Sequence, residues 1–346
     1  MRAPSSPSIS MSERARKATA PLAGTAIEIG LNAAIVAVDK LAPLILVVEG
    51  DGEPSDSLPF GPFDPLRHRT LEIGLRAWVE AQTRLKLGYV EQLYTFGDRG
   101  RHAQPSDTDP RVMSVGYLAL TRRSPKSDEV LQRSGAGWRP WYEFFPWEDW
   151  RDGRPELLDG SILPLLEAWC AKPQNADGPA RPIPRRDRVR LSFGIGGLPW
   201  DEERVLDRYE LLYEAGLTEE ARRDGRPAAL ARRSLPPLGV AMRHDHRRIL
   251  ATAISRLRGK LKYRPVVFEL MPEGFTLTEL QRTVEAISGQ HLHKQNFRRL
   301  VERGQLVEPT GGTSTATGGR PAALFRFRRE VVQERPAPGF RLGGRA

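Results

Sequence analysis

The sequence has little cysteine and no long apolar run, and each absence excludes a class of protein. Cys170 is the only cysteine among 346 residues, which excludes an internal disulfide framework. The most apolar stretch, residues 31–48, is interrupted by Asp39, Lys40 and Pro43, so no segment predicts a membrane-spanning helix. No signal-peptide pattern is present either. We therefore expect no membrane partner and a cytoplasmic location.

Negative charge is scarce in the last third of the chain. Residues 241–346 carry 20 Lys+Arg against 9 Asp+Glu, a net charge of +11, whereas residues 1–240 carry 33 against 34. A basic module joined to a neutral one indicates a polyanion as the partner of the basic part. On charge alone, the alternative is a solvated basic surface without any partner.

The basic third has the sequence pattern of two helices followed by a hairpin. Thr276 and Glu279 are spaced as a capping box, Gly289 allows a turn, and a second helix is predicted over residues 293–303. A strand, a Gly/Ser/Thr loop and a return strand are then predicted at residues 305–309, 310–319 and 320–329. This order predicts a winged helix-turn-helix.

The second helix and the hairpin carry side chains that suit DNA. Arg and Lys donate to guanine O6 and N7, Asn and Gln bind adenine N6 and N7, and cations also bind phosphates. The predicted DNA-contacting residues are Thr278, Gln281, Lys294, Gln295, Asn296, Arg298, Arg299, Arg320, Arg326 and Arg328. We expect a double-stranded operator as partner and a homodimer, because helix-turn-helix proteins usually bind two half-sites. The alternative is a fold that mediates protein contacts.

Two other residue groups have competing interpretations. The pairs His244 with His246 and His291 with His293 invite a metal site, but no further ligand cluster accompanies them, so we predict none. Four tryptophans crowd into residues 137–150. Aromatic side chains bury large areas, which predicts core packing; stacking on a ligand base is the alternative.

The front of the chain predicts a mixed α/β layer structure. Strands are expected at residues 27–38, 44–48, 89–96 and 112–121, and a helix at residues 70–87. Leu71, Leu75, Trp78 and Gln82 form the expected inner face of that helix.

Several segments, taken in order, resemble the Nudix-related transcriptional regulators of NAD metabolism. They are residues 58–61, 89–98, 111–120, 275–281, 296–299 and 319–321. The resemblance implies an α+β protein: a Nudix-like α/β/α sandwich, a linker and a C-terminal winged helix. The expected organisation is a disordered start (1–24), a ligand-sensing domain (25–165), a linker with a helix (166–240), the winged helix domain (241–330) and a disordered tail (331–346).

The resemblance also implies a degenerate Nudix box. Gly61 and Arg76 match the glycine and arginine of the box, and Glu80 matches one of its helix carboxylates. Ala77 and Ala81 stand where the other two glutamates are expected. A single carboxylate holds a Mg²⁺ cluster poorly, so we expect no catalytic residues, no cofactor and no hydrolysis. Residual activity helped by Glu72 remains the alternative.

Cations replace carboxylates next to the box, which predicts a ligand site. Arg or His stands where the upstream glutamate is expected, and the predicted ligand-binding residues are Arg67, His68, Arg69, Glu72, Arg76 and Glu80. The expected effector is an adenine nucleotide such as NAD, ADP-ribose or ATP; alternatively, the cationic segment is a solvated loop. The whole chain then predicts a ligand-responsive regulator, and a repressor, of genes for NAD biosynthesis or salvage. The rivals are an active Nudix pyrophosphatase acting on ADP-ribose, and a DNA-binding protein whose front domain only dimerises.

Overall fold

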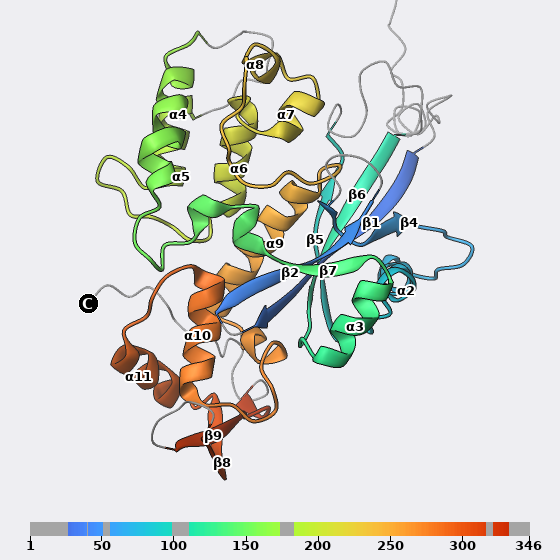
Figure 1. Cartoon of the computed structure of the whole chain (residues 1–346), viewed down its shortest axis with the longest axis vertical. Helices are drawn as coiled ribbons and strands as arrows, with labels where there is room; N and C mark the ends of the chain where they lie inside the picture. Colours follow the sequence, from blue (N-terminus) through green and yellow to red (C-terminus); the bar gives the residue numbers. More distant parts are fainter. Residues whose placement is uncertain are drawn as a thin grey trace, which may run out of the picture.

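A seven-stranded sheet forms the centre of the N-terminal region (Figure 1). The computed structural model describes residues 27–39, 41–50, 56–98, 111–173, 183–315 and 321–331. The strands are β1 (Ile27–Asp39), β2 (Ala42–Glu49), β3 (Asp56–Ser57), β4 (Phe60–Pro62), β5 (Tyr89–Phe96), β6 (Arg111–Leu120) and β7 (Ala136–Pro140). β1 pairs in parallel with β6 and antiparallel with β2 and β4, and β5 lies at the edge beside β6.

Helix α2 (Leu71–Thr83) covers one face of the sheet. Thr70 caps it by accepting a hydrogen bond from the backbone N–H of its first turn. It ends earlier than the predicted residue 87, because Arg84 adopts a left-handed conformation with φ 60°. Of the face expected from the sequence, Leu75 is fully buried and the other three residues are half-buried. Val79, which was not expected there, is fully buried too and packs with Leu75 against β1.

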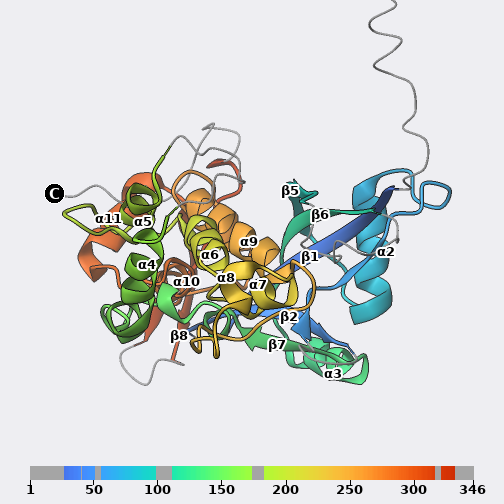
Figure 2. The same ribbon diagram turned by 90° about the horizontal axis from the view of Figure 1, so that it is seen from above.

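Helix α9 (His246–Leu261) covers the opposite face, as the view in Figure 2 shows. Its buried residues Ile249, Ala253 and Leu257 recur at helical spacing and face the sheet and its neighbours. Two helices enclosing a mixed sheet confirm the predicted α/β/α sandwich. Helix α3 (Pro125–Arg133), which the sequence analysis did not anticipate, packs beside β7 through Leu131.

The segment expected to be a linker with one helix contains several packed helices. Helices α4 (Leu163–Cys170), α5 (Arg185–Phe193) and α6 (Val205–Glu214) join the main core, whereas α7 (Glu219–Arg223) and α8 (Pro227–Leu230) pack in a small cluster with Tyr213. The short helix η3 (Leu158–Ile162) precedes them, within the segment expected to belong to the ligand-sensing domain. Helix α5 was not predicted from the sequence, because four of its nine residues are arginine. Only Val189 and Phe193 supply its apolar contact, while Arg188 pairs with Glu214 at 2.8 Å.

The predicted winged helix is present in the order expected. It comprises η4 (Val266–Glu269), α10 (Leu277–Ser288), α11 (Lys294–Gly304), β8 (Val307–Ser314) and β9 (Ala322–Phe327). The tryptophan-rich segment forms two short helices, η1 (Trp141–Glu143) and η2 (Pro146–Glu148). Trp141 and Trp147 are fully buried in the core, which confirms packing as their role.

Two of the sequence predictions concern the chain ends, which lie outside the described residues: the start at 1–24 and the tail beyond Val331. Among the helices of the described residues, none is long and apolar enough to cross a membrane.

Candidate nucleic-acid interface and ligand site

The turn between α10 and α11 is fixed by side chains of α10. At the start of α10, Thr276 Oγ1 accepts from Glu279 N at 3.2 Å and Glu279 Oε2 accepts from Thr276 N at 2.7 Å, so the predicted capping box is present. Near the end of α10, Glu285 accepts from Leu292 N at 2.9 Å and from Gln281 Nε2 at 2.8 Å. These bonds set the direction in which the second helix leaves the turn.

Gln281 differs from its predicted role as a DNA contact. Its amide nitrogen donates to Glu285 and also to the carbonyl oxygen of Leu292 at 2.8 Å. Both N–H groups are therefore used inside the turn, and the side chain shapes the interface from behind. Thr278, also predicted to contact DNA, is half-buried in the first turn of the same helix.

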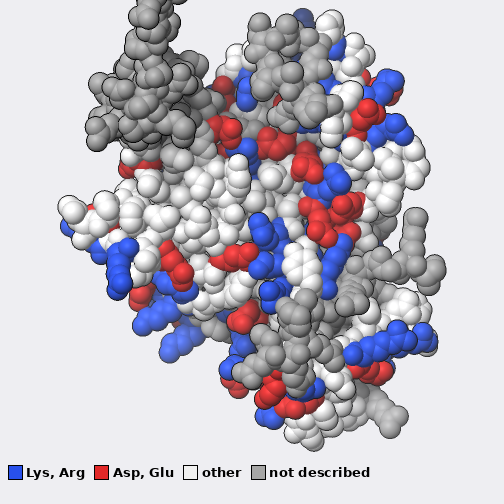
Figure 3. All heavy atoms as spheres, turned by 180° about the vertical axis from the view of Figure 1, so that it is seen from behind, with Lys and Arg blue, Asp and Glu red and all other residues white. Residues whose placement is uncertain are grey.

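Helix α11 presents a polar, basic face to solvent. Phe297 and Val301 are buried on one side, and the predicted recognition side chains are all exposed: Lys294, Gln295, Asn296, Arg298 and Arg299. None of these five forms an ion pair with another described residue. On the face drawn in Figure 3, basic and acidic side chains are intermixed over much of the surface. Donors in this arrangement suit base edges and phosphates.

The β8–β9 hairpin is anchored by aromatic rings. Phe327 stacks on Phe268 with ring centroids 4.2 Å apart, and Phe325 exchanges two backbone hydrogen bonds with Phe275. On the hairpin, the exposed Arg326 pairs with Glu308 at 2.6 Å. Arg328 is half-buried, and the predicted contact Arg320 lies outside the described residues.

Gly61, the glycine of the box, has a packing role in this structure. A Cβ atom there would lie 2.2 Å from the Trp78 ring. Trp78 Nε1 donates to Pro62 O at 2.8 Å, and the Gln82 amide bonds to both backbone groups of Phe60. The glycine therefore allows α2 to lie close against β4.

The predicted ligand-binding residues of α2 are mostly engaged with each other or with the backbone. Arg76 pairs with Glu72 at 2.8 Å and donates to the carbonyls of Leu87 and Gly88, so it ties the helix to the following loop. Glu80 lies 4.0 Å from Lys86. These contacts make Arg76 a structural residue of this helix.

The cationic segment before α2 is open to water. The Arg67 side chain is 83% exposed and lies 3.4 Å from Asp64, and Arg69 is exposed as well. His68 is half-buried beside Phe63, with ring centroids 6.3 Å apart. The structure thus brings His68 against the domain and leaves the two arginines exposed to solvent.

The carboxylates present do not fit a magnesium centre. Glu72 and Glu80 on α2 are both more than half exposed and each lies near a cation. Within the described part of the chain, no group of three or more His, Cys, Asp or Glu residues is placed to hold a metal ion. Mg²⁺ needs several oxygen ligands around one point, and the described residues do not bring them together.

A cavity of about 260 Å³ lies on the face of the sheet opposite α2. Its walls come from β1, β4, β6 and the start of α9, and its polar lining residues are Glu28, Asn32, Ser114, His244 and His246. Gly61 and Pro62 also line it, directly before the cationic segment. Volume and lining suit a planar heterocycle with a few hydrogen-bonding groups.

Three rings form one wall of this cavity. Phe60 lies edge-on to His244 at 5.3 Å and to His246 at 5.1 Å. The Leu58 backbone N–H donates to His246 Nδ1 at 3.0 Å, which fixes that ring and its tautomer. Burial, helped by the nearby Arg243 and Arg223, lowers the pKa of His244, so its imidazole is neutral at pH 7.

In the sequence alone, this histidine pair suggested only a metal site. The residues that complete the cavity come from strands far away in sequence, such as Asn32 and Ser114. In the sequence, polar and apolar residues alternate along β1 and β6, which indicates that residues such as Asn32 and Ser114 share one face of the sheet. The alternation does not tell which helix covers that face.

Comparisons with known proteins agree with this architecture. A model of the NrtR DNA-binding winged helix domain matches residues 267–327. The "ADPR responsive transcriptional repressor NtrR" of Acinetobacter baylyi is 42% identical over 90 residues, which cover 26% of this chain and 36% of the relative. The chain thus spans about a third of the length of that curated relative.

The likeness to one solved structure extends over most of this chain. NrtR from Shewanella oneidensis, complexed with a 27mer DNA, superposes with a TM-score of 0.50 at 19% identity, covering 88% of this chain and 95% of that one. A MutT/nudix family protein from Enterococcus faecalis gives 0.48 at 13% identity, covering 92% and 94%. Residues 267–327 therefore match the NrtR DNA-binding winged helix domain, and the chain shares its fold, a Nudix-like α/β/α sandwich followed by a winged helix, with NrtR from Shewanella oneidensis.

Proposed function

We propose that this protein is a ligand-responsive transcriptional repressor. The winged helix binds a double-stranded operator, and the N-terminal domain binds an NAD-related nucleotide without cleaving it. One observation carries the proposal: the segment that matches the NrtR DNA-binding winged helix domain exposes five polar or basic side chains on one face of α11. The named activity of the Acinetobacter relative supports repression and favours ADP-ribose over NAD and ATP.

The cavity beside His244 is the proposed place for the base of the nucleotide. Its aromatic wall suits stacking, while Asn32 and Ser114 supply hydrogen-bonding groups. The diphosphate would extend past Gly61 and Pro62 toward Arg67 and Arg69. Cations in place of the box carboxylates bind phosphate directly, without a metal.

The proposed assembly and setting follow from the same interpretation. A homodimer would place two α11 helices in successive major grooves. Its operators are expected near genes of NAD biosynthesis or salvage, in the cytoplasm. Because a ligand changes DNA affinity only through unequal binding to the two states, the sign of the response is an experimental result.

The test uses the full chain and an operator selected from random duplexes. Fluorescence anisotropy would measure operator affinity with and without ADP-ribose, NAD and ATP. We expect specific binding and at least a fivefold change with one nucleotide. Replacing Asn32 by Leu, inside the cavity, should abolish the response and leave basal DNA binding intact. Absence of specific DNA binding, or of any response at millimolar nucleotide, would overturn the proposal.

A further inference from the structure

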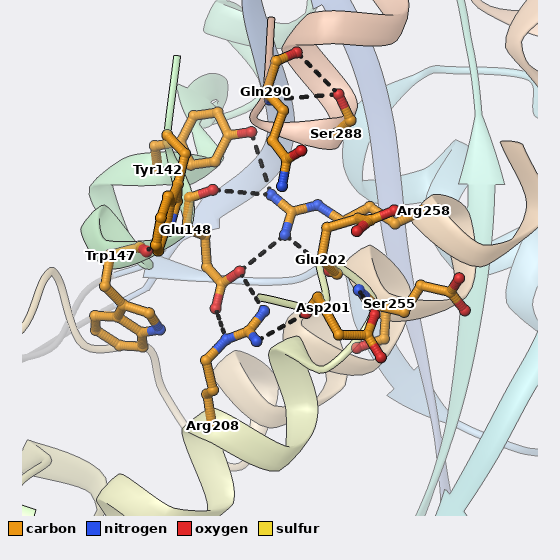
Figure 4. A network of polar contacts seen from close by, with 12 residues as sticks. Tyr142, Trp147, Glu148, Asp201, Glu202, Arg208, Ser255, Arg258, Ser288 and Gln290 are labelled. Carbon is orange, nitrogen blue, oxygen red and sulfur yellow. Dashed lines mark hydrogen bonds and ion pairs between the residues drawn. The ribbon is translucent and has the colours of Figure 1, made fainter. Parts of the chain in front are cut away.

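The C-terminal end of α10 is buried in a cluster of charged and aromatic residues from the rest of the protein (Figure 4). We call this cluster the polar joint; it consists of Tyr142, Glu148, Arg208 and Arg258. The last three have fully buried side chains. They come from η2, α6 and α9, so three separate segments meet at the base of the winged helix.

Glu148 is the centre of the polar joint. Its two carboxylate oxygens accept from Arg208 Nε at 2.6 Å and from its terminal nitrogen at 2.8 Å, a bidentate pair. One of those oxygens also accepts from Arg258 at 2.8 Å. One carboxylate therefore neutralises two buried guanidinium groups only in part, and its removal would leave both cations uncompensated.

The polar joint binds the last backbone carbonyls of α10. A helix leaves these groups without partners inside the helix, and they carry its negative dipole end. Tyr142 Oη donates to Ala286 O at 2.8 Å, Arg258 Nε donates to Ile287 O at 2.9 Å, and the Trp150 backbone N–H donates to Gly289 O at 2.7 Å. The orientation of α10 is thus set by groups outside the winged helix.

The charge states suit this attachment. Burial alone would lower the pKa of the Arg258 guanidinium, but Tyr142 and Glu148 raise it, so the side chain stays charged against the helix end. Burial raises the pKa of Tyr142, so its hydroxyl keeps the proton that it donates. A buried cation at a helix C-terminus is a favourable arrangement.

Gly289 lies in close contact with the polar joint. It has φ 72°, and a Cβ atom there would lie 2.4 Å from the Glu148 carbonyl oxygen and 2.9 Å from Tyr142 Oη. The sequence predicted a turn glycine at this position. The structure adds that the glycine also permits contact between the turn and the polar joint.

Helix α9 connects the polar joint with the cavity. His246, in its first turn, lines the cavity, and Arg258 lies twelve residues later on the same helix. At 1.5 Å per residue the two positions are about 18 Å apart. A shift of the helix start on ligand binding would therefore displace the group that holds α10.

We propose that Glu148 and Arg258 are positioning residues that set the orientation of α10, and hence of α11, and that the nucleotide acts on operator affinity through α9 and this joint. The proposal rests on the proposed function, because it needs an operator and an effector. It adds the route by which the two sites communicate, carried by a contiguous set of hydrogen bonds.

The chain offers a matched control in a second buried ion pair. Arg247, also on α9, lies 3.4 Å from Glu220 of α7, and both side chains are at most 2% exposed. Arg247 additionally donates to the carbonyls of Phe144 and Leu238, and Glu220 accepts from Met242 N. None of these partners belongs to α10 or α11. Disrupting this pair tests burial and charge without touching the winged helix.

The experiment compares Glu148→Gln with Glu220→Gln in the full chain, using thermal melts and operator titrations with and without ADP-ribose. Both variants should melt lower than the wild type. We expect Glu148→Gln to weaken operator binding about tenfold and to reduce the nucleotide-induced affinity change to less than twofold, whereas Glu220→Gln keeps both at wild-type values. Equal DNA binding and equal response in the two variants would overturn the positioning role.

Tyr142→Phe guards against a variant that fails to fold, because it removes only one hydroxyl group, which donates to Ala286 O and accepts from Arg258 at 3.3 Å. It should fold and lose part of the nucleotide response; a full wild-type response would count against the route. A wild-type protein that ignores its operator or the nucleotide contradicts the proposed function itself. A responsive wild type with an equally responsive Glu148→Gln contradicts only the polar joint.

Discussion

Helices α2 and α11 both carry many charged residues, but they use that charge in opposite ways. On α2, Arg76 is bound to Glu72 and to two loop carbonyls. On α11, Arg298 and Arg299 are exposed and form no ion pair with the described residues. A charge satisfied inside its own domain stabilises the fold, whereas one left in solvent can bind a partner at low desolvation cost.

A metal-dependent phosphate site and a DNA-binding surface require different arrangements of charged side chains. The first needs several carboxylates converging on one point, and α2 has lost that convergence. The second needs donors spread along one exposed face, which α11 retains. The charged helix at the front of the chain therefore supports structure, whereas the one near its end presents the side chains that we propose contact DNA.

The largest expected effect follows from removing one cation of α11. Arg298→Ala should weaken operator binding by about 1–3 kcal/mol, or roughly 5- to 150-fold, if the guanidinium contacts a guanine edge. Anisotropy titrations on the selected operator and on random duplex would measure it. An equal loss on both DNAs would mark a phosphate contact instead. Lys86→Ala, which removes the same charge beside α2, serves as the control and should change neither affinity.

A second prediction restores the missing carboxylates of α2. Ala77 and Ala81 are exposed and stand where the Nudix box would hold glutamates, so Ala77→Glu with Ala81→Glu should fold normally. We expect wild-type protein to release no product from ADP-ribose with Mg²⁺ or Mn²⁺, and the double variant to gain Mg²⁺ binding in roughly the millimolar range. Calorimetry would measure Mg²⁺ binding, and chromatographic detection of AMP and ribose 5-phosphate, the products of cleaving the diphosphate bond of ADP-ribose, would measure hydrolysis. Hydrolysis of ADP-ribose by the wild-type protein above background would support the pyrophosphatase interpretation.

Local patterns predicted the parts of the fold that local physics controls. The bounds of β5, the capping box at Thr276 and the second helix expected at residues 293–303 follow from periodicity and caps, and all three are present. Helix α5 was missed because its arginines outweigh Val189 and Phe193 in any window average.

The sites depend on contacts that no short window contains. Glu148 and Arg208 are 60 residues apart, and Glu148 and Arg258 are 110 apart, so their pairing appears only once the core is assembled. For the same reason the cavity beside His244 could not be placed. Gln281 shows the converse: its residue type and position suit a base contact, but neighbouring acceptors occupy it.

A third, smaller effect concerns the wing. Arg326→Ala should lower the slope of log affinity against log salt by about 0.9 if that guanidinium contacts one phosphate. The effect on affinity itself should be modest, because Glu308 already lies 2.6 Å from Arg326 and competes with the DNA. Glu308→Gln should accordingly raise affinity and steepen the slope. Slopes that stay unchanged in both variants would place the wing away from the backbone of the DNA.

The smallest effect tests whether the cavity histidine is held neutral. Burial, with Arg243 and Arg223 nearby, lowers the pKa of His244 below its ordinary value of 6.5. Below about pH 6.5 His244 becomes protonated in the unfolded chain but stays neutral in the folded chain. The free energy of unfolding therefore falls as the pH drops, and it levels off once the pH is below the folded pKa.

His244 has φ 51°, a conformation that asparagine tolerates, so His244→Asn removes the titration with little strain. Melting curves between pH 8 and pH 5 should fall less steeply for this variant, while His293→Asn, at an exposed site, should follow the wild type. A wild-type slope in His244→Asn would mean that the imidazole is already solvated, and the cavity would then be too wet to serve as a stacking site.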